Sequence, residues 1–395
     1  MDFLPSLEKH RPISLTIPFS RENLKDIIDL YRIDLVVPGA EKFLYAGVSD
    51  WCQEWMVPCF GPTMAAAALE RSKLYSKKLM DEAGIPTARY EDLTHAFLHE
   101  PTKLKKILLG FQRPVIKVSG PSTGKGVFVC FDSTEALKTL EEIKHSNIVG
   151  LEEGILVEEG LNGREISLFY ACHDENFSFL GAAQDHKRLL DNDLGPNTGG
   201  MGAFSPVSWA DEAFIQQSTV QFLIPTLKQM KKRGTPFKGV LFLGLMVDEG
   251  VAKLLEYNVR FGDPETQVLL PLIEGDLTQL LYAFAQGETA PGSIKLKDSV
   301  AVHVVKAAKG YPGTFGTEIQ TNQRIQINQN KEMNSQIFFA AVRKEGSDLF
   351  SGGGRVFGVT AMAENKLKAR ELAYRNLSYL NFQGEQYRKD IGEKP

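Results

Sequence analysis

The chain has few of the features that mark extracellular, membrane or nucleic-acid-binding proteins. Only four of its 395 residues are cysteine, with neither CxxC spacing nor the density of a disulfide framework, so we expect reduced thiols. The net charge of −4 gives no reason to expect a nucleic-acid partner. No apolar stretch reaches the roughly 18 residues that a membrane span requires. Residues 1–18 lack a basic segment followed by an apolar run, so they do not predict a signal peptide. These absences predict a cytoplasmic protein with no nucleic-acid and no membrane partner.

The remaining composition is that of an ordinary globular protein, with 43% hydrophobic and 24% charged residues. The length predicts roughly two to four domains with large cores. The sequence shows no internal repeat and no low-complexity segment. Changes of pattern divide the chain into an incomplete N-terminal α/β domain over 1–62, a core domain over 63–113 and 182–296, a lid domain over 114–181, and a strand-rich C-terminal domain over 297–395.

Local patterns predict individual elements within these regions. A cap at Ser20 followed by apolar periodicity predicts a helix to Tyr31, and residues 33–37 predict a short strand. The alanine-rich segment 64–83 predicts one long helix. Other predicted helices cover 133–144, 212–232 and 366–380, and other predicted strands cover 115–117, 127–131, 155–159, 239–248 and 251–259.

The segment 254–267, Leu-Leu-Glu-Tyr-Asn-Val-Arg-Phe-Gly-Asp-Pro-Glu-Thr-Gln, is the most informative part of the chain. A strand here places Leu254, Glu256 and Asn258 on one face. A carboxylate and an amide about 7 Å apart on a buried strand need a partner, and Mg²⁺ that carries nucleotide phosphates suits two hard oxygen donors. Arg260 then offers a planar fork for a carboxylate or a phosphate. The structural alternative is an edge strand with solvated polar residues.

The loop 119–126, Ser-Gly-Pro-Ser-Thr-Gly-Lys-Gly, has the composition of a phosphate-binding loop. Glycines let the backbone turn its N–H groups toward an anion, and Lys125 can neutralise phosphate charge. The loop is not a P-loop, because Gly126 stands where that motif needs Ser or Thr. Lys117 precedes it on a strand, where a buried ammonium would be costly without an anion beside it. The loop alone is a weak signal, and Lys117 strengthens it.

Two further blocks contain candidate ligand contacts. Residues 156–161 join a strand to a turn and are followed by Glu165, so their backbone can contact an adenine edge and the carboxylate can accept ribose hydroxyls. A surface hairpin with acidic side chains explains this pattern equally well. The second block combines the charged run 184–188, Gln-Asp-His-Lys-Arg, with the glycine-rich run 195–202, Gly-Pro-Asn-Thr-Gly-Gly-Met-Gly. Backbone that approaches a small ligand closely, with charges of both signs nearby, suits an amino-acid zwitterion.

Together these blocks resemble the phosphoribosylamine–glycine ligase (glycinamide ribonucleotide synthetase) family of ATP-grasp enzymes. The match extends from about Phe60 to the C-terminus, and its most specific parts are 184–188, 195–202 and 258–267. The resemblance implies a multidomain fold of the α/β and α+β classes, namely an ATP-grasp fold with a truncated N-terminal parallel-sheet domain and a strand-rich C-terminal domain. It also implies a reaction in purine biosynthesis: ATP, glycine and 5-phosphoribosylamine give glycinamide ribonucleotide, ADP and phosphate. The implied cofactors are ATP and Mg²⁺, or Mn²⁺ in its place, and the implied assembly is a monomer or a homodimer.

The resemblance assigns roles on the nucleotide side. Lys73 and Lys117 match the family's lysines for the ATP phosphates. The mobile phosphate lid corresponds to the loop that contains Gly120, Gly124, Lys125 and Gly126. The adenine hinge and the ribose carboxylate correspond to Glu158, Glu159 and Leu161, and to Glu165.

The resemblance also assigns the metal and glycine side. Glu256 and Asn258 match the magnesium ligands. The positions that line the acyl-phosphate and glycine side correspond to Asp185, Lys187, Arg260, Asn197, Thr198, Gly199 and Gly200. Lys117, Arg260, Asp185 and Lys187 are therefore the expected catalytic residues, with magnesium, Lys117 and Arg260 offsetting charge on the transferring phosphoryl group. The 115–180 unit is expected to close over the reactive anhydride.

The sequence departs from the family at its start. The family's first strand, Gly-rich turn and Arg-Glu-His triplet have no counterpart in residues 1–10, and the chain joins the family pattern near Ile13 to Ile33. Segment 336–342 also lacks an expected glycine, whereas 352–360 and 388–392 match the closing motifs. Three interpretations follow: a working phosphoribosylamine–glycine ligase, an ATP-grasp ligase that joins an amino acid to a different amine, or a nucleotide-binding protein without enzymatic activity. The intact ATP and magnesium residues argue against the third.

Overall fold

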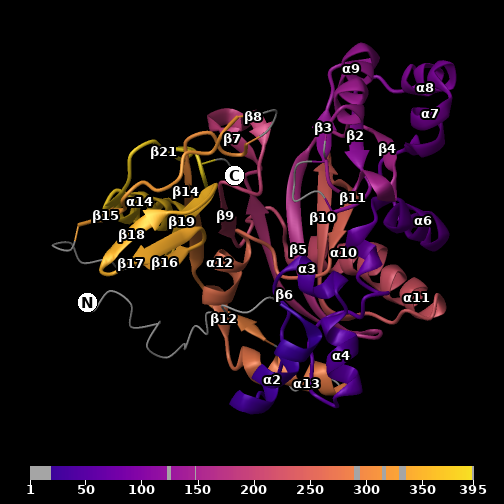
Figure 1. Ribbon diagram of the computed structural model, residues 1–395. Helices are drawn as coiled ribbons and strands as arrows, with labels where there is room; N and C mark the ends of the chain where they lie inside the picture. The colour runs from indigo at the N-terminus through magenta and orange to yellow at the C-terminus, as the bar shows by residue number, and fades with distance from the viewer. Residues whose placement is uncertain are drawn as a thin grey trace.

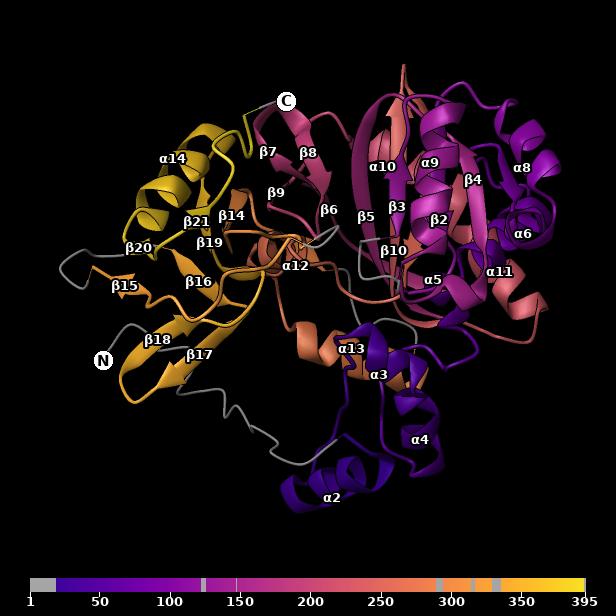
Figure 2. The same cartoon turned by 45° about the horizontal axis from the view of Figure 1, so that its top comes forward.

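The computed structural model describes residues 19–121, 126–146, 148–288, 294–313, 317–328 and 335–393. Two main sheets organise them, one of four strands and one of nine (Figure 1). The four-stranded sheet and the C-terminal strands lie at opposite sides of the molecule, and the N-terminal helices lie below (Figures 1 and 2). None of the helices in the described ranges combines the length and the hydropathy that crossing a membrane requires.

The N-terminal region contains three helices, α2 (Arg21–Tyr31), α3 (Glu41–Tyr45) and α4 (Val48–Glu54). Helix α2 begins as predicted, because Ser20 Oγ accepts a hydrogen bond from the Asn23 N–H at 3.2 Å. The strand expected over 33–37 is not formed. Among residues 19–62, parallel strand pairing is limited to a single bridge between Val36 and Cys59. No described strand flanks this bridge, so it does not extend into a sheet.

The single helix expected over 64–83 is also wrong, because two helices occupy this segment. Helix α5 (Ala68–Arg71) ends and α6 (Lys73–Ala83) begins at Ser72, whose backbone is extended. Ser72 Oγ accepts a hydrogen bond from the Tyr75 N–H at 3.3 Å and caps α6, which competes with a continuous helix. The break places Lys73 at the start of α6, where its N–H donates to the Ser119 carbonyl at 3.0 Å.

The four-stranded sheet has the order β1-β4-β2-β3. Its strands are β1 (Tyr90–Asp92), β2 (Pro114–Val118), β3 (Val127–Val129) and β4 (Ile155–Glu159). Helices α7 (Thr94–His99), α8 (Pro101–Leu108) and α9 (Ser133–Lys144) cover one face. Ile116 and Val118 pack under these helices, so the alternation along β2 turns Lys117 toward the opposite face.

The nine-stranded sheet has the order β11-β10-β5-β6-β9-β14-β19-β16, with β21 paired to β14. Its strands are β5 (Arg164–His173), β6 (Asn176–Asp185), β9 (Gly202–Ser205), β10 (Lys238–Asp248), β11 (Val251–Asn258), β14 (Val300–Ala308), β16 (Gln336–Phe339), β19 (Arg355–Ala363) and β21 (Glu385–Gln386). Because β1 joins the smaller sheet and β5 and β6 join the larger one, the expected lid boundaries at 114 and 181 do not coincide with the sheets. The division into domains stays a prediction.

The helix predicted over 212–232 consists of α10 (Glu212–Ser218), a π-helical segment (Thr219–Leu223) and α11 (Ile224–Lys232). Other helices that pack on the larger sheet are α12 (Thr266–Leu269), α13 (Leu277–Gln286) and α14 (Lys366–Leu377). Short strand pairs complete the fold: β7 (Arg188–Leu190) with β8 (Leu194–Asn197), β12 (Ile273–Glu274) with β13 (Lys295–Leu296), β15 (Gln326–Ile327) with β20 (Leu380–Asn381), and β17 (Val342–Glu345) with β18 (Asp348–Ser351).

A β-bulge interrupts β11. Two consecutive residues of β10 face Leu254 and Glu256, so Leu255 has no partner in the ladder. Leu254 therefore packs in the main core beside Tyr257, whereas Leu255 and Glu256 line the same cavity. The prediction that Leu254 and Glu256 share one face is wrong, because the extra residue of the bulge turns Glu256 to the other face. Glu256 and Asn258 keep a common face, because Tyr257 between them points into the core.

Candidate active site

A cavity of about 790 Å³ lies between the two main sheets, and we call it the intersheet cavity. Residues of β2, β3 and β4 line one wall, and residues of β5, β10 and β11 line the other. Most of the predicted site residues line it: Lys117, Glu158, Glu159, Leu161, Glu165, Asp185, Lys187, Asn197, Thr198 and Glu256. Residues from segments more than 100 positions apart in sequence therefore meet at one site.

Glu158, on β4, lines this cavity and contacts two lysines, of which Lys117 lines the cavity and Lys77 is buried behind it. Its Oε2 lies 2.9 Å from Lys117 Nζ, and its Oε1 lies 3.2 Å from Lys77 Nζ. Burial lowers the pKa of Lys77 to about 8. Burial also opposes the charge on Lys117, but Glu158 and Glu256 outweigh it and raise the pKa of Lys117. Two ammonium groups around one buried carboxylate leave positive charge in excess, which suits a phosphate.

Lys187 forms the second charged group of the cavity. Its Nζ lies 2.6 Å from Glu165 Oε2 and 3.1 Å from Asp185 Oδ1. Burial disfavours the ammonium, yet Asp185 and Glu165 outweigh it and raise the pKa of Lys187. Lys187, a predicted catalytic residue, is therefore ion-paired both with Glu165, the predicted ribose carboxylate, and with Asp185, a second predicted catalytic residue.

Glu256 lies between these two groups. Burial opposes its ionisation, but Lys187, Lys117 and Lys73 together outweigh burial and lower its pKa. Its carboxylate is therefore ionised at neutral pH and available as a metal ligand.

The residues present fit a divalent metal that also binds phosphate. Glu256 offers a carboxylate, and Asn258 on the same face offers Oδ1, which also accepts a hydrogen bond from Arg260 at 3.3 Å. In the described part of the chain, no group of three or more His, Cys, Asp or Glu residues could hold a metal by itself. Two oxygen donors with the remaining positions left to phosphates and water are what Mg²⁺ accepts.

Arg260 does not line the intersheet cavity. Its guanidinium lies 2.7 Å from Glu41 Oε1 and 3.1 Å from Glu70 Oε1. Burial raises the pKa of Glu70 to about 7, and Arg260 opposes that rise. The predicted phosphate fork is therefore held by two carboxylates, one of which comes from the N-terminal region.

The other residues predicted to bind the ATP phosphates do not gather at one place. Lys73 Nζ donates to the Val118 carbonyl at 3.0 Å and does not line the cavity. Gly120 packs so closely on Gly150 that a Cβ would lie 2.5 Å from the Gly150 carbonyl oxygen. Gly126 accepts a hydrogen bond from the Val118 N–H at 2.8 Å. Gly124 and Lys125 lie outside the described residues.

At the predicted hinge, Leu161 lines the cavity, while the side chain of Glu159 is engaged elsewhere. Glu159 Oε1 lies 2.9 Å from Lys253 Nζ and accepts a hydrogen bond from the Arg89 N–H at 3.1 Å. The hinge contribution of Glu159 is therefore restricted to its backbone, as the prediction assumed.

The glycine-rich run connects the cavity to the C-terminal region. Asn197 and Thr198 line the cavity, whereas Gly199 and Gly200 lie beside it. Arg355, at the start of β19, donates to the Gly199 carbonyl at 2.7 Å and forms an ion pair with Asp263 at 2.8 Å. The motif at 352–360 matches the family, but the sequence does not show that Arg355 within it contacts the glycine-rich run. Arg355 was therefore missed as a site residue.

Sequence reasoning also missed Lys77 and Glu265. Lys77 lies one helical turn after Lys73, so an i, i+4 comparison along α6 was the available signal. Glu265 lies inside the 258–267 motif and is almost fully buried. Burial and the neighbouring Asp185 raise the pKa of Glu265 to about 7.

Comparison with known families gives the same answer as the motifs. Residues 7–70, 71–266 and 301–394 match the N domain, the ATP-grasp (A) domain and the C domain of phosphoribosylglycinamide synthetase. The chain belongs to this family. The N-domain match begins at residue 7, whereas the motifs placed the main match from about Phe60 onward and the first family pattern near Ile13 to Ile33.

Individual relatives cover nearly the whole chain. A phosphoribosylamine–glycine ligase of Streptomyces coelicolor is 40% identical over 363 residues, which are 91% of this chain and 84% of the relative. A crystal structure of phosphoribosylamine–glycine ligase from Thermotoga maritima has a TM-score of 0.79 at 33% identity and covers 95% of this chain and 89% of that one. A biotin carboxylase from Campylobacter jejuni has a TM-score of 0.70 at 18% identity, covering 95% and 82%, and shows the fold alone.

The family is one of ATP-grasp ligases, and the multidomain ATP-grasp fold expected from the motifs is confirmed. The fold implies ATP binding, and a divalent metal is typical of it. The roles of individual residues stay predictions.

Proposed function

We propose that this protein joins glycine to 5-phosphoribosylamine in an ATP-dependent reaction of purine biosynthesis. A glycine carboxylate oxygen attacks the γ-phosphorus of ATP, and ADP leaves. The phosphoribosylamine nitrogen then attacks the carbonyl carbon of the glycyl phosphate, loses a proton, and releases phosphate. The observation that carries the proposal is Glu256, an ionised carboxylate that lines the cavity between the two sheets together with Lys117 and Lys187.

On the nucleotide side, Lys117 and Lys77 offset phosphate charge, and Glu158 holds both ammonium groups in place. The backbone at 158–161 takes the adenine, and Glu165 takes the ribose. Glu256 and Asn258 would hold Mg²⁺, or Mn²⁺, which supplies positive charge at the transferring phosphoryl group. Gly120, Gly124, Lys125 and Gly126 belong to the loop that covers the phosphates in this proposal.

On the amino-acid side, Asp185 accepts the glycine ammonium, and Lys187 lies beside the developing acyl phosphate. Thr198 supports Lys187 directly, because its N–H and Oγ1 both donate to the Lys187 carbonyl, at 2.7 and 2.8 Å. Arg260 contributes positive charge from the end of β11, fixed by Glu41 and Glu70. Closure of the four-stranded sheet toward the larger sheet excludes water from the anhydride.

The alternative function joins the amino acid to a different amine, and it requires that the chain has no site for the phosphate of phosphoribosylamine. A second cavity, of about 550 Å³, lies between Gly39, the 261–271 segment and β16. Among the residues that line it, Asp263 is the only charged one. A sugar phosphate needs cations, and this cavity supplies none from its described lining.

The deciding experiment measures ADP release with ATP, Mg²⁺ and glycine, with and without phosphoribosylamine. Stimulation by phosphoribosylamine, and formation of glycinamide ribonucleotide, is the expected result. Glycine-dependent release that ignores phosphoribosylamine would favour the alternative amine. No release with any amino acid would contradict both. Alanine in place of glycine is the control for the size of the amino-acid site.

We also propose that the protein works in the cytoplasm as a monomer or a homodimer, which sedimentation of the purified chain distinguishes.

A further inference from the structure

The two ends of one hairpin belong to the amino-acid side of the cavity. This site hairpin consists of β7, the turn Asp191–Asp193 and β8. Lys187 precedes it and Thr198 follows it, and the Lys187 carbonyl accepts both hydrogen bonds from Thr198. A displacement of the hairpin therefore moves a predicted catalytic lysine and a predicted substrate residue together.

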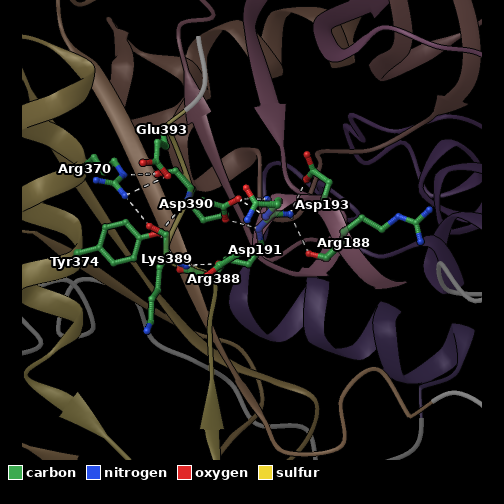
Figure 3. Close-up of polar contacts among 11 residues, drawn as sticks. Arg188, Asp191, Asp193, Arg370, Tyr374, Arg388, Lys389, Asp390 and Glu393 are labelled. Atoms are coloured by element: carbon green, nitrogen blue, oxygen red, sulfur yellow. Dashed lines mark hydrogen bonds and ion pairs between the residues drawn. The ribbon is translucent and has the colours of Figure 1, made fainter.

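Residues 388–391, the tail segment, contact every residue of that turn. The Lys389 N–H donates to Asp191 Oδ1 at 2.7 Å, and the Asn192 N–H donates to Asp390 Oδ2 at 2.8 Å. Arg388 donates to Asp193 Oδ1 at 2.8 Å, and the close-up in Figure 3 shows these contacts side by side. Arg388 also donates to the Arg188 carbonyl at 3.1 Å, at the base of the hairpin.

Arg388 and Asp390 form a buried bidentate pair. Two guanidinium nitrogens donate to the two Asp390 oxygens, each at 2.7 Å, and the Arg388 side chain is 1% exposed. Burial opposes the charge on Asp390, but Arg388 and the Asn192 N–H outweigh it and lower the pKa of that carboxyl. Removal of Arg388 leaves the buried Asp390 carboxylate without its cation, whereas removal of Asp390 leaves Arg388 with Asp193 alone.

The tail segment also contacts the left-handed part of the turn. Asn192 and Asp193 have φ of +59° and +56°, a backbone conformation that is uncommon outside glycine, although Asn and Asp adopt it more readily than other residues. Such a conformation persists where the surroundings determine it. Here the surroundings include the tail segment, which contacts both residues.

The tail segment is itself fixed to α14. Tyr374 O–H donates to the Arg388 carbonyl at 2.8 Å and accepts from the Ile391 N–H at 3.0 Å. Arg370 donates to the Lys389 carbonyl at 2.6 Å. The C-terminus lies next to β7 and β8 in both views of the molecule (Figures 1 and 2). Contacts therefore continue from α14 through the tail segment to the cavity.

His186 lies between these two parts. It lines the intersheet cavity, and burial together with the charge of Arg388 lowers its pKa to about 4. The charge of Arg388 therefore affects the pKa of His186, which lies between Asp185 and Lys187 in the sequence.

We propose that Arg388 and Asp390 are positioning residues for the amino-acid side of the active site. They hold the turn at 191–193, and the hairpin in turn keeps Lys187 and Thr198 in place for the small amino acid and its acyl phosphate. The role assigned to that side rests on the proposed function. The nucleotide residues Lys117 and Glu158 lie on the other sheet, and the nucleotide side is linked to the hairpin through the ion pair of Glu165 with Lys187, so we expect the larger effect on the amino-acid side.

The test compares Arg388→Ala with Lys306→Met in the full chain. Lys306 is the matched control, since its side chain is also 1% exposed and ion-paired, to Glu385 at 2.6 Å, in the same C-terminal region. It donates hydrogen bonds to Leu380, Asn381 and Glu385, and its ammonium lies 5.2 Å from the centroid of the Tyr387 ring, and none of these residues belongs to the site hairpin. Both substitutions should lower thermal stability. We expect Arg388→Ala to raise the KM for glycine at least about tenfold, because small misplacements of reacting groups have large effects. The Kd of ADP should change by a smaller factor than the KM for glycine, because Lys117 and Glu158 lie on the other sheet.

Hydrogen exchange gives a second measurement that does not require activity. Arg388→Ala should speed exchange at the amides of 186–202, and Lys306→Met should not. The double variant Arg388→Met/Asp390→Leu should recover thermal stability, because an apolar pair can replace a buried ion pair, and should keep the KM defect. Asp390→Asn is the milder variant if Arg388→Ala does not fold.

An unchanged glycine KM and unchanged exchange at 186–202 in Arg388→Ala would overturn the inference. Equal changes in Lys306→Met would overturn it too, because they would show general destabilisation. If the unsubstituted chain shows no glycine-dependent ADP release, the proposed function fails, while the exchange comparison still decides whether the tail segment positions the hairpin.

Discussion

At the scale of single residues, Glu256 has the most distinctive surroundings in the site. Three lysines lower its pKa although the carboxylate is buried. Glu256→Gln keeps the shape and removes the charge, so we expect Mg²⁺-dependent ADP release to fall on the order of 10²–10³-fold. A Mg²⁺ titration of the rate checks this. Glu274→Gln, at an exposed position on β12, is the control, and a Glu256→Gln rate within threefold of the unsubstituted protein would refute the ligand role.

The raised pKa of Glu265 predicts that the stability of the protein depends on pH. Its pKa is raised from 4.5 to about 7 by burial and by Asp185, so the folded state binds its proton more tightly than the unfolded state. The corresponding stability is complete below about pH 4.5 and is lost as the pH rises through 7. Glu265→Gln removes this loss, which is on the order of 2–3 kcal/mol.

Urea unfolding at pH 5 and pH 8 measures the effect. Glu265→Gln should be more stable relative to the unsubstituted protein at pH 8 than at pH 5. Glu70, whose pKa is also raised to about 7, contributes to both proteins and cancels in the difference. A difference that is equal at the two pH values would contradict the assignment.

The sequence identified charged residues through motifs but not through their contacts. Lys117, Asp185, Lys187 and Glu256 occupy the cavity as expected. The partner of Arg260 was missed, because Glu41 lies 219 positions earlier in the chain, and no local pattern reports such a distance. A single sequence shows which charged side chains are present. It does not show which of them form ion pairs with each other in the folded protein.

At the scale of elements, the glycine-rich run depends on backbone freedom. Gly200 has φ of +107°, and a Cβ there would lie 2.4 Å from Pro264 Cδ. Gly200→Ala should therefore combine backbone strain with a clash, lower the free energy of unfolding by about 2 kcal/mol or more, and reduce activity. Gly234→Ala is the matched control, since Gly234 has φ of +74° with nothing within 4 Å of a Cβ.

Urea unfolding and glycine-dependent ADP release separate the two variants. Gly234→Ala should show strain of about 1–2 kcal/mol with normal turnover. Equal effects of the two substitutions on turnover would show that the approach of Gly200 to Pro264 has no role in the site.

Elements with a strong local period were predicted well, and those that depend on tertiary pairing were not. The helix at 133–144 is observed with the predicted bounds, because Asp132 caps a regular amphipathic pattern. The bulge at Leu255 belongs to the pairing of β11 with β10, so alternation along β11 alone could not show it. Ser72 broke a predicted helix because its side chain serves as a cap.

At the scale of the whole molecule, the nucleotide site that we propose lies between both sheets. A ligand that contacts both should stabilise the folded chain by about 2.7 kcal/mol at a hundredfold excess over its Kd. MgADP should therefore raise the midpoint of thermal unfolding, and Lys117→Ala should reduce the rise. Lys138→Ala, at an exposed position on α9, is the control. A thermal shift that Lys117→Ala leaves intact would exclude Lys117 from phosphate binding.

The ladder between β9 and β14 pairs Ser205 with Ala301 and Phe204 with Val302, and so carries one sheet across the boundary expected near 297. The C-terminal quarter of the chain is therefore not an independent unit that recombination can exchange. A chain cut near residue 297 would leave a bare strand edge on each fragment, at β9 and at β14. Each fragment alone would be prone to aggregate, and the two together would have the complementary edges of a split protein that reassembles.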